Sequence, residues 1–377
     1  MRNLRNSGNS LIQFPREGLP PSASAWDPAS DSLICAFGPS ETSPVIEVKR
    51  FHSTCSSSDD ATLIASWDAP SPLPDLPVDK VLSLQYFADT ATICLVLAGG
   101  DLILLREQPL PGEDLIEIVG SVDAGITAAT WSPDEELLTL STRADTLIFM
   151  TRDFESIANN PLSPDDVKVS AHVSVGWGKS ETQFKGKRAK AMRDPTVPEH
   201  VDEGLVSTLD NRETTISWRG DGAYVAINAI LDETKRMIRV YSREGVLESV
   251  SEPVDGLEGA LSWRPAGNLM ACVQRLQDRI DVVFFERNGL RHGEFTLRVD
   301  SGDDDLWATP IDLKWNSDSS VLAVCLNDRV QLWTMGNYHY YLKQEIRSPP
   351  IRDLARRIQA TWHPEKPLHL ALCSECE

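Results

Sequence analysis

The chain has 377 residues, 41% of them apolar, and ten tryptophans, which is enough to bury a large core. Its formal net charge of −20 argues against non-specific binding of nucleic acid over the whole surface, because a phosphate backbone requires a basic footprint. The sequence has neither a signal peptide nor a run of about 18 apolar residues, so it predicts a soluble protein that is not secreted and not inserted in a membrane.

A repeated unit builds the chain, and it is clearest at residues 125–149. Three short strands are expected there, at residues 126–131, 136–142 and 146–150, because these stretches are apolar and rich in β-compatible residues. Turns separate them at 132–135 and 143–145, since a proline presets φ and an aspartate binds the local backbone. Such a unit cannot bury both of its faces alone.

The same pattern, an aromatic residue followed by a tight turn, occurs seven times. Apart from two longer gaps, the copies follow one another at about 45–52 residues, which is near the period of a four-stranded propeller blade. The sequence therefore predicts an all-β fold, a seven-bladed WD40-like β-propeller that forms a single domain over residues 1–377. The blades open near Trp26, Phe87, Trp131, Trp218, Trp263, Trp315 and Trp362.

The first two blades follow the pattern closely. Residues 10–14 form an isolated strand that needs a partner sheet. Blade one is expected from four strands at 24–26, 32–37, 45–51 and 62–67, and the proline-rich stretch 70–77 is a surface connector. Blade two lacks the tryptophan, because Phe87 takes its place, and Gly99-Gly100 supplies its hairpin.

The third blade is followed by an insertion. Residues 173–177 are expected to complete the blade, and a basic insertion then spans about residues 178–212. Within this acidic chain the insertion concentrates positive charge, so it is either a docking loop for a phosphate backbone or an acidic partner, or a solvated loop that keeps the molecule soluble. The residues that would make the contact are Lys185, Lys187, Arg188, Lys190 and Arg193.

Blades four to six have third strands at 237–241, 280–285 and 330–333, each ending in an aromatic residue. Because these aromatics and the opening tryptophans recur at one place in successive units, they are predicted to pack between blades and not to bind a ligand. Blade seven opens at 358–362, continues at 368–373 and stops, so the last blade is predicted to be incomplete. Residues 10–14 could supply one of its missing strands.

Five of the seven cysteines stand at equivalent places, in the expected second strands: Cys35, Cys94, Cys272, Cys325 and Cys373. A small buried thiol explains this spacing better than a disulfide framework does. Cys373 and Cys376 have CxxC spacing, but no second cysteine or histidine pair accompanies them at zinc-ligand spacing. The acidic run 303–305 lacks the alternating ligands of a Ca²⁺ loop. No metal site and no cofactor are therefore predicted.

A search for catalytic motifs finds no phosphate-binding Gly-rich loop with Lys-Ser/Thr, no G-x-S-x-G and no H-E-x-x-H. The sequence therefore predicts no catalytic residues and no enzymatic activity. Two other functions remain open: a general peptide-binding WD40 adaptor, and, with less support, a propeller enzyme with acids or histidines in its channel.

Several stretches lie outside any general blade consensus, among them VGWGKSETQFKG at 175–186 and FFERNGLRHGEF at 284–295. Together with the opening MRNL, with GITAATWSPDEELL and with ISWRGDGAY, they make the chain similar to the N-terminal propeller of the largest subunit of the Elongator complex, the IKAP family. The resemblance covers nearly the whole chain.

That resemblance implies a non-catalytic scaffold in a complex that converts the wobble uridine of tRNA to carboxymethyl-type derivatives. The implied partners are other Elongator subunits, including the catalytic radical-SAM subunit and a second WD40 subunit, with tRNA reached indirectly or through the basic loop. Family members have a second propeller and a helical region through which they form homodimers, and both are absent from this chain. The implied location is the cytoplasm, with the nucleus as an alternative.

Overall fold

A computed structural model describes Arg5 and residues 21–52, 61–169, 202–298, 309–347 and 358–373. Across these ranges the chain forms strands and turns, with one short 3-10 helix, η2 (Pro164–Val169), and no α-helix. No helix in the same ranges is long and apolar enough to cross a membrane. The chain divides into two compact units: unit 1 is residues 1–161 with 311–377, and unit 2 is residues 162–310.

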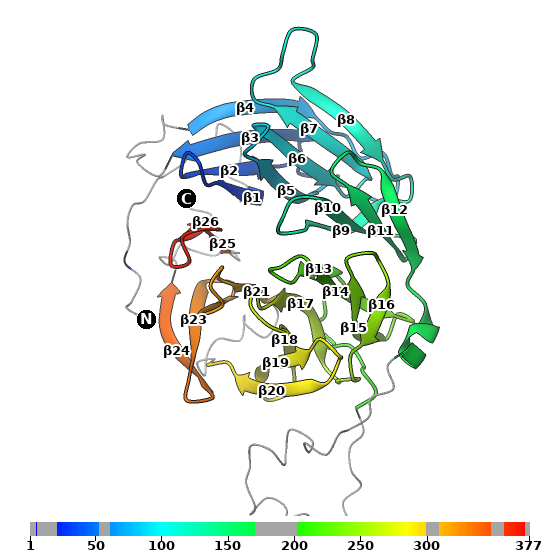
Figure 1. Ribbon diagram of the computed structural model, residues 1–377, viewed down its shortest axis with the longest axis vertical. Coiled ribbons are helices and arrows are strands. Elements are labelled where there is room, and N and C mark those ends of the chain that lie inside the picture. The colour runs from blue at the N-terminus through cyan, green and yellow to red at the C-terminus, as the bar shows by residue number, and fades with distance from the viewer. Residues whose placement is uncertain are drawn as a thin grey trace, which may run out of the picture. The chain divides into compact units, whose positions relative to one another are not determined.

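Unit 1 contains four four-stranded sheets and one two-stranded sheet in its described part, all antiparallel and each built from consecutive strands (Figure 1). The sheets are β1–β4 (Pro21–Asp27, Ser32–Phe37, Val45–His52, Ala61–Asp68), β5–β8 (Val81–Phe87, Thr92–Leu97, Asp101–Arg106, Ile116–Ser121), β9–β12 (Ile126–Trp131, Leu137–Thr142, Thr146–Thr151, Ser156–Pro161), β21–β24 (Asp312–Trp315, Leu322–Cys325, Arg329–Gly336, His339–Arg347) and β25–β26 (Gln359–Trp362, Leu370–Cys373).

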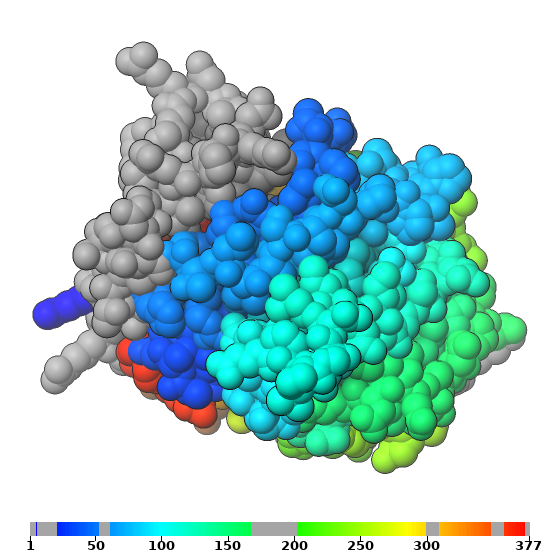
Figure 2. All heavy atoms as spheres, turned by 90° about the horizontal axis from the view of Figure 1, so that it is seen from above, coloured from blue at the N-terminus to red at the C-terminus, as the bar shows by residue number. Residues whose placement is uncertain are grey.

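The first strands of these sheets lie side by side. β5 contacts both β1 and β9, while β25 contacts both β1 and β21. Within unit 1 the sheets therefore succeed one another in the order β21–β24, β25–β26, β1–β4, β5–β8 and β9–β12. Figure 2 shows the side chains of the first three sheets of the chain as a continuous band that runs from blue through cyan to green.

Unit 2 contains two further four-stranded antiparallel sheets, and their first strands, β13 and β17, also lie side by side. The amide of Gly220, in the turn after β13, donates to the carbonyl of Pro265 in the matching turn after β17, at 3.2 Å. The sheets are β13–β16 (Thr215–Trp218, Tyr224–Leu231, Lys235–Ser242, Leu247–Val250) and β17–β20 (Leu257–Trp263, Leu269–Arg275, Ile280–Glu286, Arg291–Thr296).

Burial follows the position of a strand in its sheet. Every residue of the second strands β6 and β10 is buried. β6 (TICLVL) is accordingly a near-continuous apolar run, whereas β10 (LLTLST) also buries Thr139, Ser141 and Thr142. The fourth strands are edges, and residues of β4 and β12 are exposed or half-buried almost throughout. The predicted bounds of the inner strands are confirmed to within three residues.

Five of the seven blade-opening aromatic residues are core residues, as predicted, whereas Trp26 and Trp362 are half-buried. The relative solvent exposure is only 7% for Trp131, 7% for Trp218, 2% for Trp263 and 9% for Trp315. Phe87, the substitute in the second sheet, is also buried, and its ring meets that of Trp131 edge to face with centroids 4.9 Å apart. This geometry is favourable for aromatic pairs and joins neighbouring sheets.

The turn predicted after Trp131 is confirmed and has a simple cause. The Ser132 hydroxyl donates to Asp134 at 2.5 Å and accepts the amide of Leu137 at 3.0 Å. Glu135 adopts a positive φ of 61°, so the chain reverses within four residues. β10 begins directly after this turn.

The prediction of which strand completes the third sheet was wrong. Residues 173–177 were expected there, and they lie outside the described residues, but the fourth strand is β12, only five residues after β11. Phe154, with a φ of 62°, closes a tight turn in which its amide binds the Thr151 carbonyl, and its ring packs on Trp131. This contact of the half-buried Phe154 ring helps to return the chain directly to the sheet.

The last sheet of the chain packs against the first. The Ser24 and Thr361 hydroxyls are 2.7 Å apart, and the Trp26 indole N–H donates to the Thr361 carbonyl at 3.3 Å. The Trp26 ring also lies against His363, with centroids 4.9 Å apart. Two strands of this sheet are described, at the predicted places, whereas residues 10–14 lie outside the described residues.

His363 is wholly buried, and its ring has a fixed set of neighbours. Nδ1 accepts the backbone N–H groups of Glu365 at 3.1 Å and Lys366 at 3.0 Å, so the other ring nitrogen carries the proton. Nε2 lies 3.2 Å from Oδ1 of Asp31, in the turn after β1. Burial, followed by the positive charge of Lys366, lowers the pKa of His363.

The cysteine prediction is also confirmed. Cys35, Cys94, Cys272, Cys325 and Cys373 lie in the second strands β2, β6, β18, β22 and β26, all as free thiols. Cys376, the second residue of the CxxC pair, lies outside the described residues.

Candidate docking site

The five predicted contact residues, Lys185, Lys187, Arg188, Lys190 and Arg193, all lie outside the described residues, as does the acidic run 303–305. The structure therefore does not test them as a site. It does describe the chain on both sides, up to Val169 and again from Asp202, and both flanks belong to unit 2. How these flanks are held determines where the basic insertion leaves the sheets and where it returns.

The chain leaves the sheets through the turn of η2, which packs against β16. Arg239 of β15, fully buried, donates from Nε to Oδ2 of Asp166 at 2.9 Å and from Nη2 to the carbonyl of Ser163 at 3.4 Å. Oδ2 of Asp166 also accepts the Ser163 amide at 3.0 Å. We call this group, Ser163, Asp166 and Arg239, the entry anchor.

The chain returns through a cradle of backbone amides around one carboxylate. The N–H groups of Glu203, Gly204 and Leu205 donate to Oδ1 of Asp255 at 2.9, 2.8 and 2.9 Å. Successive amides that converge in this way form an anion-binding concavity, here filled by a side chain of the same unit. Gly204 has a φ of +79°, a conformation that favours glycine and lets the three amides point the same way.

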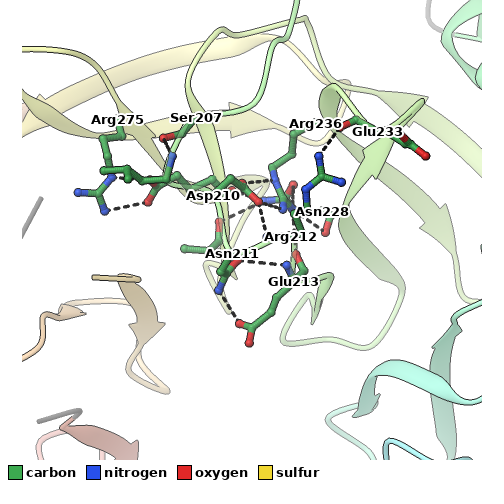
Figure 3. Close-up of polar contacts among 12 residues, drawn as sticks. Ser207, Asp210, Asn211, Arg212, Glu213, Asn228, Glu233, Arg236 and Arg275 are labelled. Carbon is green, nitrogen blue, oxygen red and sulfur yellow. Dashed lines mark hydrogen bonds and ion pairs between the residues drawn. The ribbon is translucent and has the colours of Figure 1, made fainter. Parts of the chain in front are cut away.

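A buried ion pair holds the next few residues, and with the Asp255 cradle it forms what we call the exit anchor. Arg236 of β15 grips Asp210 with two hydrogen bonds, from Nε at 2.7 Å and from Nη2 at 2.6 Å (Figure 3). Its Nη1 donates to the carbonyl of Glu213 at 3.0 Å. The side chains of Arg236 and Asp210 are 0% and 1% exposed, so neither charge is solvated.

Figure 3 shows how the rest of the returning loop is braced. The guanidinium of Arg212 donates to the carbonyl of Glu233 at 3.0 Å, and the Asn211 amide donates to Glu213 at 2.6 Å. Nearby, Arg275 of β18 is buried against Glu258 and donates to the carbonyl of Thr309 at 2.9 Å. The guanidinium of Arg275 thus joins β18 to a segment outside its sheet, and that of Arg212 joins the returning loop to the turn before β15.

These buried contacts make the two anchors costly to break. A buried Arg–carboxylate pair contributes little relative to an apolar pair, but removing one partner leaves an uncompensated charge and costs about 3–5 kcal/mol. Two such pairs, Arg239–Asp166 and Arg236–Asp210, originate from one strand, β15. The insertion is therefore attached at both ends to the same sheet by contacts that cannot be exchanged for water cheaply.

Sequence reasoning missed the anchors, although a signal was present. β15 reads KRMIRVYS, with arginines at 236 and 239 in a strand that is buried from its second residue onward. A strand expected to be buried on both faces can hold an arginine only if a carboxylate reaches it. Which carboxylate does so depends on tertiary contacts and could not be deduced from spacing.

The part of the chain that the structure describes offers little for other kinds of site. No group of three or more His, Cys, Asp and Glu side chains there could hold a metal ion. Trp131, Trp218, Trp263 and Trp315 are buried in the sheets and offer no ligand platform. The candidate site is therefore the basic insertion, whose two ends are held by the entry and exit anchors.

Comparison with known proteins gives the chain its class and then its family. Residues 1–365 match a family model described as "ELP1 first N-terminal beta-propeller". The match and the succession of four-stranded antiparallel sheets define a β-propeller protein. The chain belongs to the Elongator complex protein 1 family, which confirms the resemblance noted in the sequence.

Three relatives, each named Elongator complex protein 1, illustrate the similarity. The protein of Schizosaccharomyces pombe is 43% identical over 359 residues, which cover 93% of this chain and 27% of the relative. That of Saccharomyces cerevisiae is 43% identical over 384 residues, covering 91% and 26%. That of Mus musculus is 41% identical over 319 residues, covering 80% and 23%. The chain thus spans about a quarter of the length of these relatives.

Proposed function

We propose that this chain is a non-catalytic scaffold part of the Elongator complex, which supports the modification of wobble uridines in tRNA to carboxymethyl-type derivatives and hence translation. Family membership supports a place in that multi-subunit complex. The observation that carries the scaffold role is the pair of buried anchors, because they attach the basic insertion at both ends to one sheet of unit 2.

The basic insertion serves as a docking element in this proposal. Lys185, Lys187, Arg188, Lys190 and Arg193 supply positive charge in a chain of net charge −20. At physiological salt the Debye length is about 8 Å, so charges that act beyond that distance from the sheets are felt separately from the acidic remainder. An acidic surface of a neighbouring subunit is the favoured contact, and tRNA phosphate is the alternative that the experiment separates from it.

The expected partners follow from the same assignment. They are the catalytic radical-SAM subunit, a second WD40 subunit and, through regions of the longer family member, a second copy of the protein. The expected location is the cytoplasm, with the nucleus as a second location.

The test is made in the full-length protein within its purified complex. Lys185, Lys187, Arg188, Lys190 and Arg193 are all replaced by Ser. We expect co-purification of the other subunits to fall, which identifies a docking element. If co-purification is unchanged while tRNA affinity falls and its salt dependence flattens, the segment contacts phosphates instead.

A charge-matched control separates the effect of where the lysines lie from the effect of changing the net charge. The double variant Lys185→Ser, Lys187→Ser is compared with Lys80→Ser, Lys343→Ser, which removes two exposed lysines, one just before β5 and one in β24. Only the first pair should weaken assembly. If neither assembly nor tRNA affinity changes in the five-residue variant, the insertion is a solvated loop and the docking role is wrong.

A further inference from the structure

The hairpin of β23 and β24 in unit 1, orange in Figure 1, ends in exposed aromatic side chains. Its strands pair as far as Gly336 and His339, which leaves only Asn337 and Tyr338 in the turn. Tyr338 is 89% exposed, whereas the other exposed large apolar or aromatic side chains of the described residues range from 38% to 67%. We call residues 335–342 of this hairpin the tyrosine tip.

The turn holds Tyr338 in a backbone conformation that disfavours tyrosine. Asn337 and Tyr338 have φ of 49° and 64°, the two positive values that a two-residue type I′ turn requires. Glycine is preferred at the second of these places, because a Cβ crowds the backbone there. The corresponding hairpins of unit 2 place Gly245 and Gly289 at their positive φ. A tyrosine kept in a strained conformation points to a function.

Packing inside the fold explains the aromatic residue of one other hairpin but not Tyr338. Phe154, which turns the chain between β11 and β12, also has a positive φ, and its ring packs on Trp131 with centroids 6.1 Å apart. Tyr338 is almost wholly exposed, so its ring gains no comparable packing. The ring of Phe154 therefore stabilises its own sheet, whereas the ring of Tyr338 is available to another molecule.

The second exposed tyrosine of the tip is already held in place. A Cβ on Gly336 would lie 3.5 Å from Cε2 and 3.7 Å from Cδ2 of Tyr341, so the Tyr341 ring covers this glycine across the hairpin. Tyr341 nevertheless remains 51% exposed, and Met335, the residue before the glycine, is 44% exposed. A ring that is ordered before binding loses little freedom in an interface, which makes it an effective contact.

The charge of the tyrosine tip indicates the class of its partner. Residues 335–342 read MGNYHYYL and contain no Asp, Glu, Lys or Arg, although the chain has a net charge of −20. A platform for single-stranded nucleic acid combines aromatic rings with a basic groove, and these residues supply no basic groove. An uncharged tip with exposed tyrosine and methionine instead complements an uncharged, apolar protein surface.

We propose that the tyrosine tip inserts into an apolar pocket of another protein subunit of the complex, with Tyr338 and Tyr341 as the main contacts. The inference rests on the proposed place of this chain in the Elongator complex, but the basic insertion takes no part in it. Burial of the Tyr338 ring in the pocket offsets the strain of its positive φ. Glycine at position 338 is therefore better for the free chain, and tyrosine is better for the complex.

The test is Tyr338→Gly in the full-length protein, measured alone and with the purified set of other subunits. The free variant should unfold at a temperature about 1–3 °C higher than the wild type, because glycine relieves the strained turn. Its affinity for the other subunits should nevertheless fall about tenfold or more, since an interface contact is lost. A lower unfolding temperature or an unchanged affinity would overturn the proposal.

A photocrosslinker at the same position, Tyr338→p-benzoylphenylalanine, identifies what covers the tip in the purified complex with bound tRNA. The crosslink should join the tip to a peptide of another subunit. A crosslink to tRNA would assign a nucleic-acid platform instead, and a crosslink within the same polypeptide, or none, would equally contradict the proposal.

Val246→Ser is the matched control, because Val246 is 60% exposed in the hairpin between β15 and β16 of unit 2. This variant should keep the wild-type affinity, and an equal loss of affinity would show that the effect is not specific to the tyrosine tip. The basic insertion is intact in all of these variants. Failure of the tyrosine tip and failure of the insertion as docking elements are therefore measured separately.

Discussion

Trp263 shows what a single aromatic residue contributes. It packs in the core of unit 2 with Leu261, Met270 and Phe285, and its indole N–H donates to the carbonyl of Gly267 at 3.3 Å. Replacing it by alanine removes this packing and leaves a cavity, so Trp263→Ala should lower the free energy of unfolding by about 3–5 kcal/mol. Urea denaturation measures the change.

The same loss is expected for alanine at Trp131, Trp218 or Trp315, because they occupy the same place in their sheets. Leu63→Ala is the control, since Leu63 is 53% exposed on the edge strand β4 and should change stability by less than about 0.5 kcal/mol. A tryptophan variant that unfolds like the wild type but loses a partner would show that the residue is a ligand contact.

His363 should make stability depend on pH. Its pKa is lowered in the folded protein, chiefly by burial, so the unfolded chain binds the proton more readily. The stabilisation is fully present above the unfolded pKa of about 6.5 and is lost as pH falls through the folded pKa. The unfolding temperature should therefore drop between pH 7.5 and pH 5.

His363→Asn separates this effect from that of the carboxylates. The asparagine oxygen can accept the N–H groups of Glu365 and Lys366 as Nδ1 does, but it does not titrate. The variant should lose less of its unfolding temperature over the same pH interval. Parallel curves for the two proteins would mean that His363 contributes nothing to acid destabilisation.

At the scale of elements, the exit anchor predicts a local effect together with a global one. Asp210→Ala leaves the charge of Arg236 buried without a partner, so it should cost about 3–5 kcal/mol. Hydrogen exchange should also speed up at residues 203–214, because the returning loop loses its attachment to β15. Adding Arg236→Met should recover part of the loss, since it removes the stranded charge.

Asp221→Ala is the matched control for this prediction. Asp221 also makes a two-bonded pair with an arginine, Arg219, but its side chain is 56% exposed. Water can replace that pair, so the cost should be at most about 1 kcal/mol. Equal effects of the two alanine variants would contradict the assignment of a buried anchor.

The elements also show why some strands could be predicted and others could not. β6 and β10 are buried throughout and lie between turn residues, so their bounds were deduced closely although β10 contains Thr139, Ser141 and Thr142. β12 reads SIANNP, and as an exposed edge strand it needs no apolar face, so residues 173–177 appeared the better candidate. Its position depends on the Phe154 turn, a tertiary packing effect.

The candidate site, too, could be predicted from the sequence only in part. The basic charge of Lys185 to Arg193 is visible in the sequence because it contrasts with an acidic chain. The carboxylates that fasten the insertion, Asp166, Asp210 and Asp255, look like any surface aspartates in the sequence, since their partners are brought by other segments. Pattern reasoning therefore located the charge and not its attachment.

At the scale of the whole molecule, the seven aromatic-turn copies correspond to seven sheets in the described part of the chain. The number of blades in the assembled propeller stays a prediction, because units 1 and 2 are each described by themselves. The chain spans about a quarter of its relatives, and this share of the length already carries the match to the family.

The contact between the first and the last sheet has a consequence for how the protein is made. Each four-stranded sheet pairs only strands that are consecutive in the chain, so it can form as soon as its own residues leave the ribosome. Ser24 and Thr361, however, are separated by 337 residues. At about 5–20 residues per second, the face of the first sheet that carries Ser24 waits roughly 20–70 s for its partner to be synthesised. Throughout that interval Trp26 lacks the ring of His363, and a nascent chain paused before residue 358 would present this uncovered face to chaperones.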